Sequence, residues 1–422
     1  MIRTRVGYTV FLYLLLPYIG LRLLWRGRKQ PGYRRHIAER FGFFRSQTSK
    51  PIIWLHAVSV GETRAALPLI QQLQTRYPQH QILLTHMTPT GRDTGEELFG
   101  DSVLHGYLPY DFPCAVRRFL KHFKPAIGLL METEIWFNLI HACNTSRIPV
   151  LLINARLSEK SARKYAKFAQ LTQESLQGLS AIAAQTDVDA ARLSALGAKH
   201  IQITGNLKFD ISPPRSAIEL GQVLRQQFGE GRPIFLAAST REGEETLLLD
   251  VVQHTDIPDL LTVIVPRHPQ RFDAVAALLD KHGIRYQRRS ANQAVLPQTQ
   301  VVLGDSMGEM FAYYSACDIA FIGGSLLPLG GQNLIEACAL GKPVLLGPHT
   351  YNFAEVSELA VAAGAAIRVQ NADELLTQVA VLSQDKHKQQ KMGQAGLDFS
   401  RQHQGATERV LRLMEGYLLV SH

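Results

Sequence analysis

The sequence predicts an α/β protein with two domains, each built around a parallel sheet with helices on both faces. Short apolar runs alternate with helical patterns along almost the whole chain, which is typical of parallel sheets. The alternation pauses at residues 211–214, a proline-bearing stretch, and then starts again. A length of 422 residues is sufficient for two domains of ordinary size. A hydrophobic content of 46% with 19% charged residues excludes a disordered chain.

An apolar run near the N-terminus, residues 6–21, predicts a membrane-anchor helix. The run is slightly shorter than the roughly 20 residues of a full span. Basic residues follow it instead of a small-residue cleavage site, which favours an uncleaved anchor beside anionic lipid on the cytoplasmic side. A buried first helix is the alternative, and spanning or interfacial placement stays open. We assign residues 1–30 to the anchor and its flank, with the basic residues Arg26, Arg28, Lys29, Arg34 and Arg35.

We assign residues 31–210 to the first domain and residues 211–406 to the second, with a cleft between them. Residues 407–422 predict a C-terminal helix that could pack back onto the first domain. The strands expected in the first domain are residues 52–55, 82–85, 103–108, 126–131, 150–154 and 182–184. Those expected in the second are residues 234–237, 261–265, 301–304, 319–322, 344–346 and 366–369.

One strand–loop–helix unit in the second domain has the pattern of a nucleotide site. The strand at residues 318–322 is followed by Gly323-Gly324-Ser325, then by Gly330-Gly331-Gln332-Asn333 and a helical pattern from Leu334 to Leu340. Ligands bind at the carboxyl ends of strands in open α/β sheets, where glycines let backbone amides approach phosphate. Ordinary turns are the alternative explanation for the glycines alone. The Gly-Gly-amide-Asn-x-x-Glu order resembles the donor-nucleotide site of GT-B glycosyltransferases.

Charge and cysteine content narrow the classes of partner. A net charge of +9 and a pI of about 9.4 suit an anionic partner. The four cysteines stand in apolar contexts without a CxxC pattern and indicate buried thiols in a reducing compartment. Residues 187–189 spell Asp-Val-Asp, but the preceding Thr186 favours a helix cap over a metal motif. No other cluster has convincing metal-ligand spacing, so we expect no metal and no cofactor.

Three residues of the first domain are candidates for chemistry. Glu62 follows the first strand, and with Ser59 it also matches a capping box, so a structural role is the alternative. A helix N-terminus favours the charged carboxylate, whereas desolvation would push the pKa back up. Glu132 stands at a strand end, where either it or Glu134 could enter the cleft while the other fixes the loop. Lys208 could neutralise a carboxylate or phosphate of a bound donor.

Loops after the strands of the second domain suit phosphate. Residues 239–245 offer hydroxyls and backbone amides. Arg267 could pair with phosphate in a forked geometry, and His268 could contact phosphate or base. Gly308 and its neighbours could line a base and ribose, and Glu336 could accept hydrogen bonds from ribose hydroxyls. Surface turns are the alternative for these loops.

Several strings in order resemble the Kdo transferases of lipopolysaccharide biosynthesis, and the match covers nearly the whole chain. The strings are His56-Ala-Val-Ser-Val-Gly-Glu-Thr63, Met87-Thr-Pro-Thr-Gly91, Leu108-Pro-Tyr-Asp111, Met131-Glu-Thr-Glu134, Asn154-Ala-Arg-Leu-Ser158, Gly205-Asn-Leu-Lys-Phe-Asp210, Val265-Pro-Arg-His-Pro269 and Gly323-Gly-Ser325. Some family members have His where this chain has Gln332, and Asn-Pro where it has Asn333-Leu334. Because Gln keeps a hydrogen-bonding side chain, we expect tuning and not loss of activity.

The resemblance implies a GT-B fold of two Rossmann-like domains and an inverting, metal-independent transfer of Kdo from CMP-Kdo to a lipid A precursor, lipid IVA. It implies a location at the inner membrane with the catalytic domains on the cytoplasmic side. Glu62 would be the proton acceptor, and Glu132 and Lys208 would stabilise the transition state. The CMP-binding residues would be Pro266, Arg267, His268, Met307, Gly308, Glu309, Asn333, Leu334, Ile335 and Glu336.

Two alternative functions remain at this stage. The nearer is a GT-B enzyme that uses a UDP-sugar for another envelope glycolipid. The other is a membrane-anchored nucleic-acid-binding protein, suggested by charge alone. The basic residues near the anchor do not alternate with aromatics as such a surface requires, so we expect no nucleic-acid partner.

Overall fold

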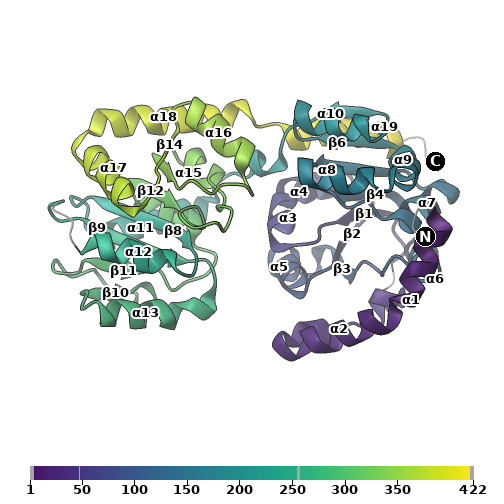
Figure 1. The fold of residues 1–422 in the computed structure, drawn as a ribbon, viewed down its shortest axis with the longest axis horizontal. Coiled ribbons are helices and arrows are strands. Elements are labelled where there is room, and N and C mark those ends of the chain that lie inside the picture. The colour runs from purple at the N-terminus through teal and green to yellow at the C-terminus, as the bar shows by residue number, and fades with distance from the viewer. Residues whose placement is uncertain (1–3, 47, 254–256, 419–422) are drawn as a thin grey trace. The chain divides into compact units, whose positions relative to one another are not determined.

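The computed structural model describes residues 4–46, 48–253 and 257–418, and it divides into two compact units (Figure 1). The first unit contains the chain up to Ile211 and the segment after Gln404, and the second runs from Ser212 to His403. Residues 1–3 of the anchor assignment and residues 419–422 of the C-terminal assignment lie outside the described residues.

The first unit is built on a seven-stranded parallel sheet with the order β3-β2-β1-β4-β5-β6-β7. All six strands expected from the sequence are present, and β7 is an addition that its three-residue, largely exposed sequence did not reveal. The strands are β1 Ile52–His56, β2 Gln81–His86, β3 Leu104–Tyr107, β4 Pro125–Met131, β5 Val150–Ala155, β6 Ala181–Ala184 and β7 Ile201–Ile203.

Helices cover both faces of this sheet because alternate side chains of the central strand enter opposite apolar layers. Ile53 and Leu55 pack in one layer, whereas Ile52 and Trp54 pack in the other. The helices are α3 Val60–Ala65, α4 Leu67–Arg76, α5 Pro89–Phe99, α6 Pro113–Phe123, α7 Phe137–Thr145, α8 Glu159–Ala166, α9 Ala169–Gln177, α10 Asp187–Ala195 and α19 Ala406–Leu418.

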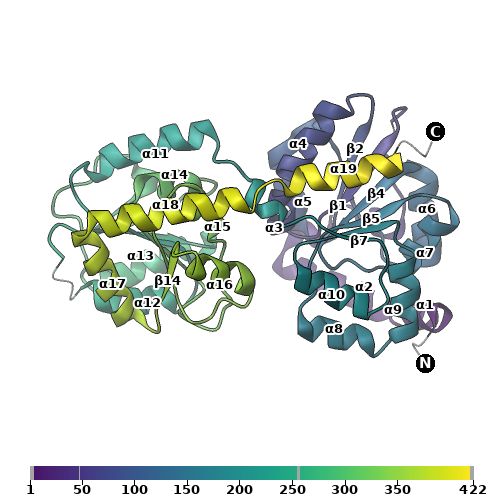
Figure 2. The ribbon, with the colours of Figure 1, turned by 90° about the horizontal axis from the view of Figure 1, so that it is seen from above.

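The C-terminal helix α19 belongs to the first unit, where Figure 2 shows it lying across the sheet. Leu411 and Met414 are fully buried in the same apolar layer as Ile53. The carboxylate of Asp210 accepts hydrogen bonds from the backbone N–H groups of Gly405 (2.6 Å) and Thr407 (2.5 Å). The first sheet and α19 therefore share one hydrophobic core, although α19 lies far from the strands in the sequence.

The N-terminal apolar run forms two helices instead of the single anchor helix that we expected. Helices α1 (Arg5–Leu14) and α2 (Leu16–Lys29) are bent by 53° at Leu15, two residues before Pro17. Proline near the start of α2 lacks the N–H that a continuous helix would need. Among the described residues, no single helix has the length and apolarity of a membrane span, and only this bent pair meets that test when taken together.

The second unit contains another seven-stranded parallel sheet, with the order β10-β11-β9-β8-β12-β13-β14. The six expected strands are present, and the half-buried, polar β10 is the addition. The strands are β8 Ile234–Thr240, β9 Leu261–Pro266, β10 Tyr286–Arg288, β11 Val301–Leu303, β12 Ile319–Ile322, β13 Val344–Leu346 and β14 Ala366–Arg368. The helices are α11 Arg215–Phe228, α12 Glu244–Val252, α13 Phe272–Lys281, α14 Met310–Ala316, α15 Ile335–Ala339, α16 Ala354–Ala362, α17 Ala372–Gln384 and α18 Lys386–Gln402.

Both sheets have a point where the strand order reverses, and ligands of such sheets bind there. In the first sheet this point lies between the neighbours β1 and β4, and in the second between β8 and β12. Glu62, Glu132 and the segment 333–336 follow these strands, whereas Lys208, residues 266–268 and residues 307–309 lie at the ends of β7, β9 and β11.

Candidate active site

Glu62 lies in the first turn of α3, just after the central strand β1, and is 9% exposed. Ser59 is the N-cap of this helix, and its hydroxyl donates to Oε1 of Glu62 (2.8 Å). The backbone N–H of Val58 donates to Oε2 (2.8 Å). The predicted capping arrangement is therefore present, and it fixes both carboxylate oxygens of Glu62 in one orientation.

Burial raises the pKa of Glu62 to about 7, and the negative charge of Glu132 contributes in the same direction. The hydrogen bonds from Val58 and Ser59 and the proximity of His56 act in the opposite direction but do not outweigh burial. A carboxylate with a pKa near neutrality is a competent general base, because about half of it is ionised at neutral pH and it still holds a proton well. Desolvation of the Glu62 carboxylate therefore raises its pKa more than the hydrogen bonds at the helix N-terminus lower it.

Glu132 and Lys208 meet at the same edge of the first sheet. Glu132 directly follows β4 and adopts a left-handed backbone conformation (φ 57°), which turns the chain sharply at the strand end. The ammonium of Lys208 lies 3.3 Å from Oε1 of Glu132. Lys208 belongs to a single 3-10 turn, Leu207–Asp210, that follows β7. Lys208 therefore pairs with a carboxylate of the protein itself, and its contact with a bound donor stays a prediction.

Glu134 fixes the loop that begins at Glu132. Its carboxylate accepts a hydrogen bond from the indole N–H of Trp136 (2.7 Å) and lies 3.8 Å from Nε2 of the buried His56. The neighbouring Thr133 hydroxyl donates to the carbonyl oxygen of Arg156 (2.7 Å). Of the two glutamates weighed in the sequence, Glu132 contacts Lys208, whereas Glu134 holds the loop.

Asn154 is a positioning residue that the sequence analysis did not single out. It is fully buried in β5 and has a φ of 49°, and the register of β5 against β6 shifts at this point. Its side-chain oxygen accepts a hydrogen bond from the backbone N–H of Leu207 (3.0 Å), next to Lys208. An Asn at a strand end is the signal that could have found it, because Asn adopts the left-handed region more readily than most residues.

The first unit therefore combines a buried base with an adjacent ion pair. Glu62 can accept a proton, and Lys208 places a positive charge beside the second carboxylate, Glu132. Such a constellation suits the activation of a hydroxyl group next to an electrophilic centre.

In the second unit, Glu244 joins the two loops at the point where the strand order reverses. It is fully buried and accepts hydrogen bonds from the backbone N–H groups of Arg241 (2.9 Å), Gly324 (2.5 Å) and Leu326 (3.0 Å). A side chain at Gly323 would meet the carbonyl oxygen of Ser239 at 2.5 Å, so only glycine allows this close approach. Glu244 thus holds the glycine loop against the loop after β8.

Pro266, Arg267 and His268 follow the neighbouring strand β9. Pro266 is the last residue of that strand, and the backbone N–H of Arg267 donates to the carbonyl oxygen of Thr240 (2.9 Å). Partial burial lowers the pKa of His268, and the positive charges of Arg241 and Arg267 lower it further. Cationic groups from two adjacent loops therefore gather at this sheet edge, which suits a phosphate.

Met307, Gly308 and Glu309 follow β11 at the same edge. Met307 is 54% exposed, and Gly308 has a φ of 80°. Glu309 accepts a hydrogen bond from the Ser306 hydroxyl (2.6 Å) and pairs with Arg289 (3.3 Å). Exposed backbone and a fixed carboxylate are thus available beside the phosphate loops.

The segment from Asn333 to Glu336 differs in part from the expectation. The side chains of Leu334 and Ile335 are buried in the core, so only their backbone can face a ligand. Helix α15 spans only five residues, because Gly341 and Pro343 end it early, and it is too short for the helix dipole that the sequence suggested. Asn333 and Glu336 are half-buried and joined by a 3.1 Å hydrogen bond from the amide of Asn333.

Metal ligation finds no support among the described residues, in which no group of three or more His, Cys, Asp or Glu side chains has a metal-binding arrangement. Thr186 caps α10 by accepting a hydrogen bond from the backbone N–H of Asp189 (3.1 Å). Asp189 also accepts from the backbone N–H of Leu157 (2.7 Å), so the Asp-Val-Asp string is structural, as the sequence indicated.

The chain resembles two protein families over successive segments. Residues 35–211 match the family described as 3-deoxy-D-manno-octulosonic-acid transferase (kdotransferase). Residues 247–399 match the family described as glycosyl transferases group 1. These two matches place the carboxylate site in the first family segment and the cationic loop after β9 in the second.

Solved structures with low sequence identity show the same fold. A glycosyltransferase from Rickettsia africae ESF-5 covers 88% of this chain with 99% of its own, at a TM-score of 0.62 and 14% identity. A UDP-GlcNAc 2-epimerase from Neisseria meningitidis covers 88% of this chain with all of its own, at a TM-score of 0.60 and 17% identity. The fold is that of GT-B glycosyltransferases.

Two relatives match along nearly their whole length. The 3-deoxy-D-manno-octulosonic acid transferase of Bordetella pertussis is 43% identical over 97% of this chain and 99% of its own. The enzyme of the same name from Haemophilus influenzae is 41% identical over 96% of both chains. Together with the match of the first unit, these identities show that the chain is a glycosyltransferase and belongs to the family of 3-deoxy-D-manno-octulosonic acid transferases.

Proposed function

We propose that this protein transfers Kdo from CMP-Kdo to a hydroxyl group of a lipid A precursor, lipid IVA, in lipopolysaccharide biosynthesis. The observation that carries the proposal is the buried Glu62, whose pKa is about 7, beside the Glu132–Lys208 pair. An alcohol is a weak nucleophile, so a base of this strength is what its activation requires. The names of the relatives from Bordetella pertussis and Haemophilus influenzae supply the sugar.

In the proposed reaction, Glu62 accepts the proton of the acceptor hydroxyl. The hydroxyl oxygen then forms a bond to the anomeric carbon of Kdo, while the bond from that carbon to the CMP phosphate oxygen breaks. The electron pair of the broken bond leaves with CMP, and direct displacement inverts the anomeric centre. Lys208 and Glu132 stabilise the charges that develop on the sugar in the transition state. No metal takes part.

We assign the leaving CMP to the loops of the second unit. Arg267 would neutralise the charge that grows on the phosphate, His268 would donate a hydrogen bond to the phosphate as a neutral imidazole, and Glu244 would hold the glycine loop in place. Met307, Gly308 and Glu309 would contact the nucleoside, together with Asn333, Glu336 and the backbone of Leu334 and Ile335. Pro266 would set the direction of the Arg267 loop.

A UDP-sugar donor is not favoured. The relatives at 41% to 43% identity carry the name of Kdo transferases, whereas the UDP-GlcNAc epimerase shares only the fold at 17% identity.

We further propose that helices α1 and α2 hold the enzyme at the inner membrane, with the catalytic units on the cytoplasmic side. Val6, Leu14 and Leu21 are each about two-thirds exposed at 68%, 66% and 68%, which leaves apolar surface for a bilayer. Meanwhile the hydroxyl of Thr9 donates to the side chain of Asn138 (3.1 Å), and Tyr8 packs edge-on against Phe137. A helix held to the first unit on one side and apolar on the other suits the membrane interface.

The decisive experiment is mass spectrometry of a tetra-acylated lipid A precursor after incubation with the purified protein and CMP-Kdo, with EDTA added once the donor has been made. We expect a mass increase of one or more Kdo units. No increase with CMP-Kdo, together with turnover of a UDP-sugar, would overturn the proposed donor. Loss of turnover on adding EDTA would overturn metal independence.

The variant Glu62→Gln tests the proposed base. General-base catalysis contributes roughly a hundredfold to ten-thousandfold, so we expect kcat to fall by at least about a hundredfold. The matched control is Glu97→Gln, a change of the same kind at an exposed position of α5. A kcat of Glu62→Gln within about threefold of wild type would remove Glu62 from the role of base.

A further inference from the structure

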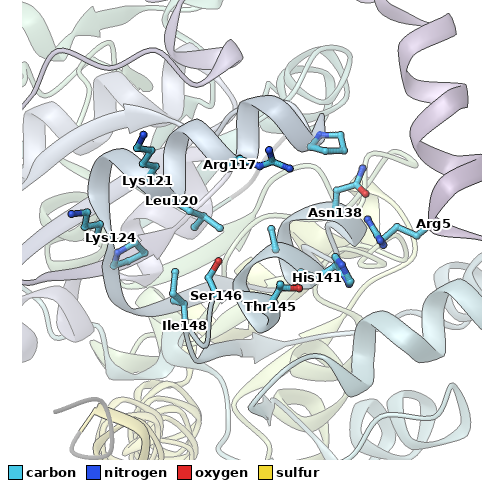
Figure 3. Close-up of a pocket in the computed structure, with 13 residues that line it drawn as sticks. Arg5, Arg117, Leu120, Lys121, Lys124, Asn138, His141, Thr145, Ser146 and Ile148 are labelled. Carbon is cyan, nitrogen blue, oxygen red and sulfur yellow. The ribbon is translucent and has the colours of Figure 1, made fainter.

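A groove between α6 and α7, on the first unit, is lined by cations and has no part in the chemistry described above. Its volume is 770 Å³, within the range of small-molecule sites. Figure 3 shows Arg117 and Lys121 along α6, Lys124 just after its end, His141 on α7, and Arg5 of α1 at the end near Asn138. None of the thirteen lining residues is acidic.

The spacing of the cations on α6 puts them together on the groove side of the helix. Arg117 and Lys121 are four residues apart on α6, so they share one face, and Lys124 follows as the C-cap residue and also lines the groove. The remaining cationic residues of α6 are engaged elsewhere, since Arg118 donates to the carbonyl oxygen of Phe41 (3.1 Å) and His122 contacts that of Ser46 (2.7 Å). Arg118 and His122 therefore have structural contacts, whereas Arg117 and Lys121 face the groove.

The groove cations lack counter-charges in the described part of the chain. No carboxylate there lies within ion-pair distance of Arg5, Arg117, Lys121 or Lys124, although twenty such contacts are present elsewhere. Four like charges around one groove repel each other, and an anion would relieve that repulsion. The two guanidinium groups offer forked donors that fit phosphate oxygens.

The neighbourhood of the groove indicates where its anion comes from. Arg5 belongs to α1, the helix whose Val6, Val10 and Leu14 are 68%, 47% and 66% exposed. In a bilayer, the layer of headgroup phosphates lies directly outside the acyl chains. One short helix thus supplies both apolar side chains for the acyl layer and a cation for the groove.

We propose that the groove between α6 and α7 binds the phosphate headgroup of an anionic membrane phospholipid. The bound lipid orients the first unit on the membrane surface, while α1 and α2 supply the apolar contact. This role is separate from the transfer reaction and does not depend on the identity of the sugar. The apolar residues Leu120 and Ile148, which also line the groove, suit the glycerol part of such a headgroup.

The test is co-sedimentation of the full-length protein with vesicles of phosphatidylcholine alone or with about 30 mol % phosphatidylglycerol. The double variant Arg117→Ala/Lys121→Ala removes two groove cations, and Lys160→Ala/Lys164→Ala removes two exposed cations with the same spacing on α8. We expect the groove variant to bind the anionic vesicles about tenfold more weakly, and the α8 variant to change less than about twofold. Binding to phosphatidylcholine should be equal for all three proteins.

Equal losses for the two variants would overturn the proposal, because they would mean attraction by net charge alone. Unchanged binding of the groove variant to anionic vesicles would also overturn it. If that variant instead showed a raised KM for the acceptor in detergent, the groove would belong to the acceptor's phosphates. A thermal melt of each variant, followed by circular dichroism, verifies that both are folded at the assay temperature.

Discussion

Glu62 shows how burial turns an ordinary carboxylate into a base. Its first-turn position and two hydrogen bonds favour the ionised form, yet its pKa is about 7 because desolvation outweighs them. The charge of Glu132 adds to the effect, and Lys208 limits it by pairing with Glu132. The three residues therefore form one cluster of charged groups.

The raised pKa of Glu62 has a cost in stability that can be measured. A carboxylate whose pKa rises from 4.5 to about 7 on folding destabilises the folded state as pH rises through that window. The loss amounts to roughly 3 kcal/mol once both states are ionised. We expect Glu62→Gln to unfold at higher urea concentration than wild type near pH 8, and at a similar concentration near pH 4. A variant less stable than wild type near pH 8 would contradict the burial argument.

Lys208 sets the charge balance of the site, so its removal should change the pH dependence of catalysis. In Lys208→Met, the two carboxylates face each other without the cation, and Glu62 should lose its proton only at higher pH. We expect kcat to fall about a hundredfold and the midpoint of its pH profile to move above that of wild type. Lys391→Met, on the exposed side of α18, is the control. An unchanged midpoint would show that Lys208 acts elsewhere.

At the scale of elements, the ends of the main strands could be predicted from the sequence. Two short strands, the length of one helix and one side-chain contact could not. The apolar runs before Glu62 and Glu132 are unambiguous, and neighbouring parallel strands bring their ends together. Strands β7 and β10 were not predicted because each has only three residues, all partly or largely exposed, which is too short for a clear periodicity. The length of α15 and the contact of Asn154 with Leu207 depend on packing that no local pattern records.

Asn154 links strand β5 to the turn that carries Lys208, and two variants separate its roles. In Asn154→Ala, the lost hydrogen bond and the strained left-handed backbone should together lower the free energy of unfolding by about 2–3 kcal/mol. Asn154→Gly relieves the strain and should cost less. Both should lower kcat, because the Leu207–Asp210 turn loses its anchor. Urea titration with parallel kinetics provides the measurement. Equal stabilities for the two variants would exclude a contribution from backbone strain.

At the scale of the whole molecule, the first unit is made of two separate stretches of chain. Helix α19 fills the apolar layer on one face of the first sheet, and Asp210 binds the backbone at its start. The sequence predicts this helix and suggests that it could pack back onto the first domain. It does not show which face of the first sheet the helix covers. The first core is therefore incomplete without residues that follow the entire second unit.

Shortening a buried side chain at the centre of α19 should destabilise the first unit and leave the second unit unaffected. Leu411 is fully buried, so Leu411→Ala should lower the free energy of unfolding by about 2–5 kcal/mol. We expect hydrogen exchange to quicken in β1 and β4 and to stay unchanged in β8 and β12. Leu413→Ala, a partly buried neighbour on the same helix, should cost less. Faster exchange in both units alike would mean that they unfold together.

The discontinuous first unit also dictates an order of events during synthesis. Domains usually fold as they leave the ribosome, the N-terminal one first. Here the second unit is contiguous and can fold as soon as His403 has emerged, whereas the first waits for α19. Throughout that interval, an apolar sheet face and the nascent α1 are exposed together at the ribosome. This order predicts a period in which the first unit depends on chaperones or on early contact with the membrane, and in which the surroundings of Glu62 are completed last.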